Sequence, residues 1–186
     1  MRISTLIAAA SIFALTACGD SGTVEDPGDP DQVAAAMADI AKPQPGEYTT
    51  TGELIDFEIS GASEEEQAMM RGFMEMGAAQ TQTICITEEQ ADAGFEEFLG
   101  AMQENSDECT FTNFSVDGDT LDATMNCDDG AGSTGTIEFG GTIAETSQDM
   151  TVTMNMTNAT EGQTMRMVLR NQTERVGECS ATTGAG

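Results

Sequence analysis

The sequence predicts a single α+β domain: an antiparallel β-meander of about six strands, forming a curved sheet or partly open barrel, with two inserted helices. Three observations indicate this fold. Apolar and polar residues alternate over most of the second half of the chain, as in strands with one buried face. Two earlier stretches repeat apolar residues at helical spacing behind capping motifs. Short Asp- and Gly-rich turns favour antiparallel neighbours.

The first predicted elements are a short helix over residues 33–40 and a strand over residues 47–59, where Gly52 suggests a bulge. Ser63 and three following glutamates then predict the start of a helix that runs to about residue 79. This helix carries methionines and one phenylalanine at helical spacing, which we expect to pack in the core: Met69, Met70, Phe73, Met74 and Met76.

A strand over residues 81–86 and a second helix follow. Thr87 and Gln90 form a capping box, which predicts a helix from there to about Gln103. One face of this helix is expected to be apolar through Phe95, Phe98, Leu99 and Met102.

The second half of the chain predicts hairpins. Residues 111–116 and 120–127 flank the turn 117–119, and a loop over residues 130–135 leads to strands over 136–139, 150–158 and 164–175. The last two strands flank a polar turn at residues 159–163, so we expect them to pair with a shared apolar face. The candidate ligand groove lies on that face: Met154, Met156, Met165 and Met167.

Residues 1–17 predict a signal peptide, because one positive charge precedes a short apolar run. The run ends in Leu15-Thr16-Ala17-Cys18, which resembles the lipobox of bacterial lipoproteins. This resemblance implies lipidation of Cys18 and a location in the cell envelope facing the periplasm, with Gly19 favouring the outer membrane. We expect a flexible acidic tether over residues 18–42, one domain over 43–180, and a disordered tail over 181–186.

Four cysteines remain once Cys18 is assigned to the lipid, and an even number in an exported protein predicts two disulfides. Cys85 and Cys109 bracket a predicted helix, so the favoured pairing is Cys85–Cys109 with Cys127–Cys179. The alternative is Cys109–Cys127 with Cys85–Cys179, because Cys109 and Cys127 lie symmetrically about the turn of a predicted hairpin.

The composition excludes several classes of function. A formal net charge of −27 disfavours nucleic acid and anionic lipid as partners. The chain has no histidine, which removes Ser-His and Cys-His catalysis and histidine-based zinc sites. We therefore expect no enzyme activity and no cofactor.

Three further patterns could indicate ligands, and each has a simpler interpretation. The thirteen methionines could bind Cu(I), but the alternating strand positions favour core packing or an apolar groove, so we expect no metal. The acidic turns 117–119 and 128–130 lack the spacing of a calcium loop and fit ordinary turns. Arg166 and Arg170 share one strand face and are expected to pair with carboxylates on neighbouring strands.

The order of the motifs resembles a known family. Pro45-Gly46-Glu47-Tyr48 opens the first strand, Thr81-Gln82-Thr83-Ile84-Cys85-Ile86-Thr87 follows, and Arg175-Val176-Gly177-Glu178-Cys179 closes the chain's last strand. Together with the four cysteines over about residues 43–180, this set is similar to the periplasmic family called domain of unknown function 3617. The resemblance implies a disulfide-linked periplasmic domain but carries no activity. Tyr48 stands where that family often has Trp, and the helical insert at residues 63–79 is longer.

Three functions are compatible with these observations. The favoured one is a monomeric, non-enzymatic envelope lipoprotein that binds a partner or a small apolar ligand in a sheet-lined groove. The first alternative is a structural or stress-related envelope protein without a ligand. The second alternative is a hydrolase that uses two carboxylates.

Overall fold

The computed structural model describes residues 22–38, 40–94, 108–159 and 162–180. The predicted signal peptide, Cys18 and the tail over residues 181–186 lie outside these ranges. So does the part of the second predicted helix that carries Phe95, Phe98, Leu99 and Met102.

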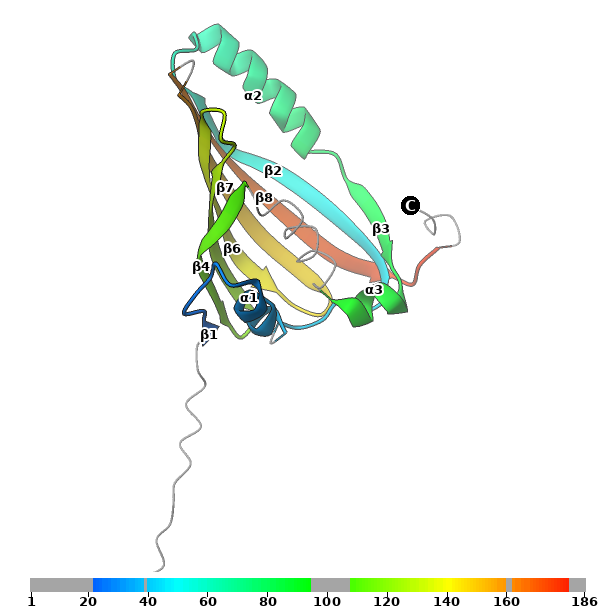
Figure 1. Ribbon diagram of the computed structural model, residues 1–186. Helices are drawn as coiled ribbons and strands as arrows, with labels where there is room; N and C mark the ends of the chain where they lie inside the picture. The colour runs from blue at the N-terminus through cyan, green and yellow to red at the C-terminus, as the bar shows by residue number, and fades with distance from the viewer. Residues whose placement is uncertain (1–21, 39, 95–107, 160–161, 181–186) are drawn as a thin grey trace, which may run out of the picture.

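Within the described ranges the chain forms one antiparallel sheet in the order β1-β4-β5-β6-β7-β8-β2-β3 (Figure 1). The sheet is curved and open, and with its helices it confirms the predicted α+β class. Its strands are β1 (Gly22–Thr23), β2 (Gly46–Ile59), β3 (Gln82–Ile86), β4 (Cys109–Asp117), β5 (Thr120–Asp128), β6 (Ser133–Ile143), β7 (Ser147–Asn158) and β8 (Gln163–Gly177). The helices are α1 (Pro30–Met37), α2 (Glu64–Ala78) and α3 (Glu88–Ala93).

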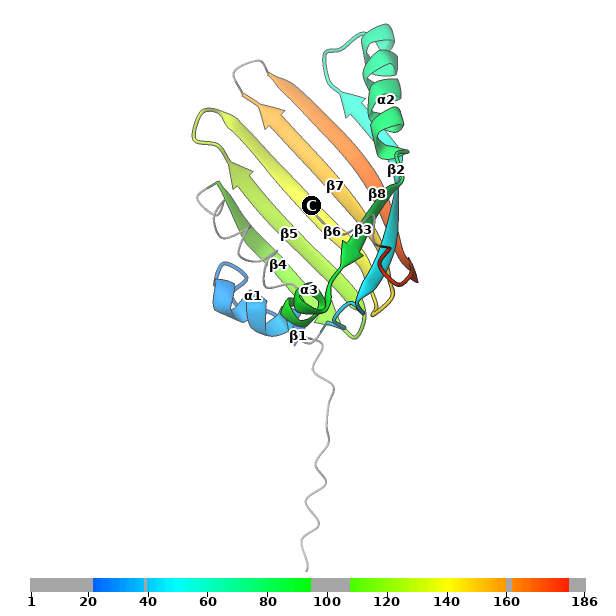
Figure 2. The ribbon, with the colours of Figure 1, turned by 90° about the vertical axis from the view of Figure 1, so that its right-hand side faces the viewer.

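Strands β4 to β8 form a continuous meander, whereas β2 joins it from earlier in the chain. β2 pairs with β8 along almost its whole length, and only its first five residues pair with β3 on the other side. Helix α2 runs beside the remaining edge of β2 (Figure 2). There Arg71 donates to the Ile55 carbonyl at 3.4 Å, so α2 satisfies part of an edge that would otherwise be open.

The pairing of β2 with β8 shifts register twice, between Glu47 and Tyr48 and between Leu54 and Asp56, and neither shift lies at Gly52 as predicted. Gly52 pairs regularly with Asn171. A Cβ at this position would lie 2.6 Å from the Ala78 carbonyl oxygen. The glycine is therefore needed for the close approach of α2, a tertiary reason that the local pattern does not contain.

One end of the inner face of the sheet is closed by α1, whose side chains complete the main apolar cluster. Val33 is 2% exposed and Phe114 is 3% exposed, and the Phe114 ring meets Phe111 edge to face at a centroid distance of 5.3 Å. The buried members of the cluster are Val33, Met37, Ile40, Phe114, Val116, Leu121, Ala123, Ile143 and Met150.

The position of α1 corrects the prediction that residues 18–42 form a flexible tether. The Asp29 carboxylate caps the helix by accepting from the Asp31 amide, and Pro30 occupies the first turn. The helix therefore begins three residues before the predicted start at Val33. Since β1 also pairs with β4, the described residues from Gly22 onward belong to the folded domain.

The predicted capping box at Thr87 is present, and the predicted helix start at Ser63 is also a capping box. Ser63 and Glu66 exchange side-chain to backbone hydrogen bonds at the start of α2, and Thr87 and Gln90 do the same for α3. Helix α3 ends at Ala93, and Gly94 follows it with a φ of +59°. The predicted continuation to Gln103 lies outside the described residues.

The two disulfides join Cys109 to Cys127 and Cys85 to Cys179, so the pairing favoured above is wrong and the alternative is confirmed. Cys109 and Cys127 are direct register partners in the β4–β5 hairpin, with Cα atoms 4.0 Å apart. β3 and the end of β8 flank the start of β2 on its two sides. Glu47 of β2 pairs with Cys85 on one side and with Gly177 on the other, and this pairing brings Cys85 close to Cys179. The order of the strands in the sheet decided the pairing, whereas the favoured prediction relied on the helix that Cys85 and Cys109 were expected to bracket.

Candidate functional site

The four methionines of the predicted groove come together on the inner face of the sheet. In the β7–β8 register Met154 is opposite Met167 and Met156 is opposite Met165. Because each pair is two residues from the next, all four side chains point to the same face. We call these four residues the methionine block; each is half-buried.

Apolar residues of the flanking strands extend the methionine block on both sides. Phe57 and Ile59 of β2 pair with Met167 and Met165, while Ile137 and Gly135 of β6 pair with Met154 and Met156. A side chain at Gly135 would run into the Met156 sulfur, so the glycine leaves the room that this methionine fills. An apolar lane therefore crosses four strands from β6 to β2.

A hollow of about 450 Å³ lies at the rim of this lane, where β2 leads toward α2. Its apolar wall consists of Ile59, Met156 and Met165, and the side chain of Gln67 reaches it from α2. The Ile59 amide donates to the Gln67 side-chain oxygen at 3.5 Å. The lane therefore ends in a partly polar mouth next to α2.

The methionines of α2 are not part of the core, which corrects the prediction for that helix. Gln67, Arg71, Met74 and Ala78 form its partly buried side. On the opposite side Met69, Phe73 and Met76 are 70%, 70% and 64% exposed. The sequence already indicated this orientation. The side of the helix formed by residues 67, 71, 74 and 78 is partly polar, as expected for a helix that packs beside a strand edge and not in the core.

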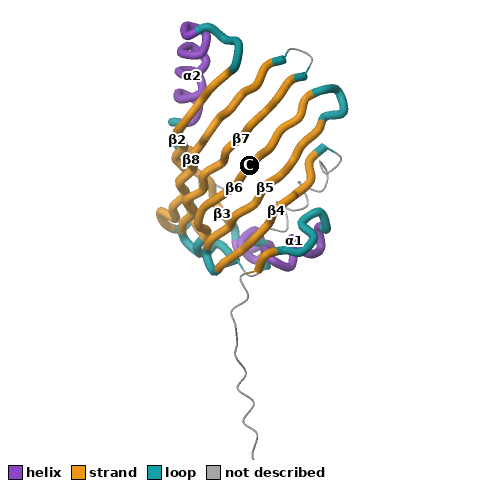
Figure 3. The backbone as a smooth tube through the Cα atoms, turned by 90° about the vertical axis from the view of Figure 1, so that its left-hand side faces the viewer, coloured by secondary structure: helices purple, strands orange, loops and turns teal. Residues whose placement is uncertain are grey.

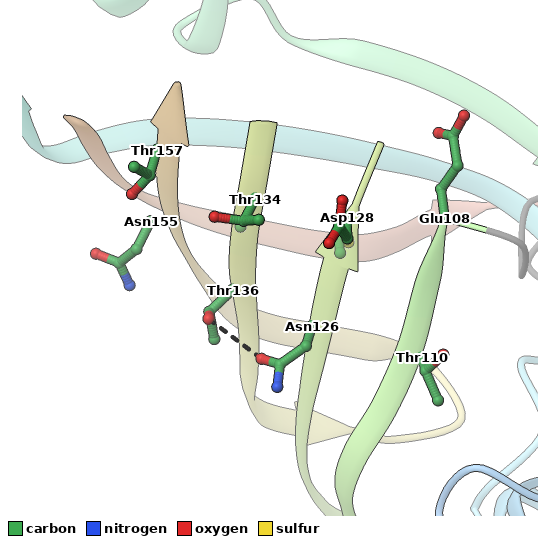
Figure 4. A pocket seen from close by; sticks show the side chains of 10 residues that line it. Glu108, Thr110, Asn126, Asp128, Thr134, Thr136, Asn155 and Thr157 are labelled. Atoms are coloured by element: carbon green, nitrogen blue, oxygen red, sulfur yellow. Dashed lines mark hydrogen bonds between the residues drawn. The ribbon is translucent and has the colours of Figure 1, made fainter. Parts of the chain in front are cut away.

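The outer face of the sheet is polar, and Figure 3 looks onto this side. A hollow of about 570 Å³ lies there, lined mainly by Thr, Asn and acidic side chains of β4 to β7 (Figure 4). In it the Thr136 hydroxyl donates to the Asn126 side chain at 3.2 Å. The alternation of the strands therefore separates a polar outer surface from the apolar lane.

Arg166 and Arg170 lie on the outer face and pair with carboxylates of neighbouring strands, which confirms the prediction for them. Arg166 pairs with Asp56 of β2, and Arg170 holds Asp149 of β7 through two hydrogen bonds of 2.8 and 2.5 Å. These bonds lower the pKa of Asp149 below its ordinary value. Both arginines are thus engaged within the chain.

The acidic turns are explained by backbone hydrogen bonding. The Asp129 carboxylate accepts from the amides of Ala131 and Ser133, both at 2.8 Å, and these bonds lower its pKa. Gly118 has a φ of +59°, as the β4–β5 turn requires. In the part of the chain that the structure describes, no three Cys, Asp or Glu residues are grouped to hold a metal ion.

Tyr48 has a structural role at the end of β2. It is 3% exposed, and its hydroxyl lies 2.7 Å from the Gln44 carbonyl and 3.0 Å from the Glu145 carbonyl. Burial raises the pKa of its phenol, against the opposing charge of Arg175. These hydrogen bonds connect the start of β2 to the β6–β7 turn.

Among the described helices none is long and apolar enough to cross a membrane. A family model described as "Protein of unknown function (DUF3617)" matches residues 43–179. No curated protein and no solved structure matches the chain.

Proposed function

The chain belongs to the DUF3617 family, whose description assigns no activity, and from this premise we propose that its domain is a non-enzymatic binding module of the bacterial envelope. The proposed ligand is a small apolar molecule or an apolar segment of a partner, taken up on the inner face of the sheet. The observation that carries the proposal is the methionine block: four flexible apolar side chains that are aligned on one face and only half-buried.

The chemistry of the lane suits an apolar ligand of variable shape. Methionine side chains are unbranched and polarisable, so they adapt to irregular ligands. The residues that line the lane are Met, Phe, Ile and Gly, and the lane therefore offers little to recognise a polar ligand. The mouth near Ile59 and Gln67 gives a polar end group a place at the rim.

Three carboxylates with a lowered pKa serve the fold. A carboxylate enzyme of the glycosidase type needs one carboxyl group that stays protonated, usually because burial raises its pKa. The described carboxylates with a shifted pKa are Glu66, Asp129 and Asp149, and each is shifted downward. These groups are held in the ionised form, which suits hydrogen bonding within the fold.

The proposal includes a lipid anchor on Cys18, and the fold makes that anchor short. Gly22 lies four residues after Cys18 and pairs with Val116 of β4. Four extended residues span at most about 14 Å, which limits the distance from the lipid anchor to β1. The anchor would hold the β1 edge of the domain close to the bilayer. The intact mass of membrane-extracted protein tests this: we expect cleavage before Cys18 plus attached acyl chains, and release of Cys18→Ser from the membrane fraction.

Ligand binding is tested by titrating the purified protein with the neutral, environment-sensitive dye N-phenyl-1-naphthylamine. The background fluorescence of the protein is low because the chain has no Trp. We expect saturable binding that Met156→Thr/Met165→Thr weakens about tenfold or more. Met69→Gln/Met76→Gln is the matched control, since it removes two methionines outside the lane. Native mass spectrometry of protein from the periplasm provides the second readout. A bare mass and no saturable fluorescence change would favour the structural alternative without a ligand.

A further inference from the structure

Helix α2 presents an apolar stripe that no described element covers. Met69, Phe73 and Met76 follow one another at helical spacing over two turns, about 10 Å along the axis, and each is at least 64% exposed. They lie on the side opposite Gln67, Arg71 and the rest of the face that contacts β2. Exposed apolar side chains gathered in this way mark interaction surfaces more often than single exposed ones do.

The stripe is held in place by a well-formed helix. The Ser63–Glu66 capping box fixes its first turn, and Arg71 links the helix both to Glu75 at 2.9 Å and to the Ile55 carbonyl of β2. A preformed helix loses little conformational entropy when a partner binds to it. The exposed side chains therefore stand on a rigid support.

Charge decides which partner suits this surface. Every Lys and Arg in the described ranges already donates to an acceptor of the chain: Lys42, Arg71, Arg166, Arg170 and Arg175. Glu65 and Glu66 lie one turn before Met69 on its side of the helix. The full chain has a formal net charge of −27, so the protein repels a second copy of itself and anionic headgroups, and attracts cations.

We propose that Met69, Phe73 and Met76 form a docking surface for a cationic amphipathic helix of a partner protein. The partner's apolar residues at a spacing of three and four pack between the three side chains, as in other helix-in-groove contacts. Its Lys or Arg residues one turn further along meet Glu65 and Glu66. This surface is separate from the methionine block, so it binds its partner whether or not the inner face holds a ligand.

The test measures binding of the full-length protein, solubilised in detergent where membrane-bound, to a fluorescein-labelled peptide of Leu and Lys with a helical apolar stripe. A Leu/Glu peptide of the same pattern and a scrambled Leu/Lys peptide are the comparison ligands. We expect the Leu/Lys peptide to bind best, and Met69→Gln/Phe73→Gln/Met76→Gln to weaken it at least tenfold. The substitutions keep every charge, and Gln is a good helix former. Val176→Gln, which removes an exposed apolar side chain elsewhere, is the matched control and keeps wild-type affinity.

Unchanged affinity in the triple variant would show that charge alone attracts the peptide and would overturn the proposal. A wild-type dimer in sedimentation that the triple variant loses would overturn it in favour of a second copy. Preferential binding of zwitterionic vesicles through the stripe would overturn it in favour of a lipid surface. Amide shift changes in the wild-type protein give an independent readout: the Leu/Lys peptide shifts α2, and shifts confined to other elements count against the proposal.

Discussion

The two disulfides constrain loops of very different length, and removing them should lower stability by different amounts. In the chain-entropy description, cross-linking residues 94 apart stabilises the fold by about 4.7 kcal/mol, and cross-linking residues 18 apart by about 3.2 kcal/mol. The Cys109–Cys127 loop lies inside the Cys85–Cys179 loop. With the inner loop closed, the outer one is effectively about 76 residues long, which reduces its contribution to about 4.5 kcal/mol.

Cys85→Ala/Cys179→Ala keeps only the short loop, and Cys109→Ala/Cys127→Ala keeps only the long one. We therefore expect the first variant to lower the free energy of unfolding by about 1.5 kcal/mol more than the second does. Urea denaturation of the two double variants and the oxidised wild type, each followed by circular dichroism, measures this difference. Both variants lose a full pair, so no free thiol remains from the broken bond. Equal losses, or a larger loss from the hairpin pair, would refute the loop-length reasoning.

The same variants test what holds β3 in place. β3 has five residues, and each pairs with β2 alone, so Cys85–Cys179 is its covalent link to the end of β8. Hydrogen exchange should accelerate in β3 of Cys85→Ala/Cys179→Ala before it does in β4 and β5. Uniform acceleration across the sheet would mean that this disulfide acts on the whole domain and not on its edge strand.

Three other predictions concern single side chains. Tyr48 is the only tyrosine, and burial raises its pKa. Ultraviolet titration should therefore show the phenol ionising above its ordinary range. The stability that the neutral phenol contributes is present below the pKa of the unfolded chain and is lost as the pH rises through the pKa of the folded protein. Arg170→Gln should raise the pKa of Asp149 toward its ordinary value, as measured by carboxyl NMR titration. In the wild type the lowered pKa of Asp149 contributes stability that is present above the pKa of the unfolded chain and is lost as the pH falls through the pKa of the folded protein. Ser63→Ala should remove the α2 cap and cost about 1 kcal/mol of local stability, read as faster exchange of the α2 amides, while α3 amides stay unchanged.

Several features of this protein follow from short stretches of sequence. The helix start at Ser63, the capping box at Thr87, the β4–β5 turn around Gly118, and the shared face of the β7 and β8 methionines were all predicted. Each depends on residues within a turn or on the two-residue period of a strand, and these local preferences act wherever the segment lies. The part of the candidate site that comes from the β7–β8 hairpin could therefore be predicted from the sequence.

The other features depend on which segments meet in space. Strand β2 pairs with β8 across more than a hundred residues, which brings Cys85 to Cys179 and places Phe57 and Ile59 beside the methionine block. The same pairing leaves one edge of β2 for α2 and turns the Met69 stripe toward solvent. Local sequence preferences set the type of each element, its cap and its apolar residues. The contacts that each apolar face makes follow from the assembled fold, because burial is a property of the whole sheet and not of any one segment.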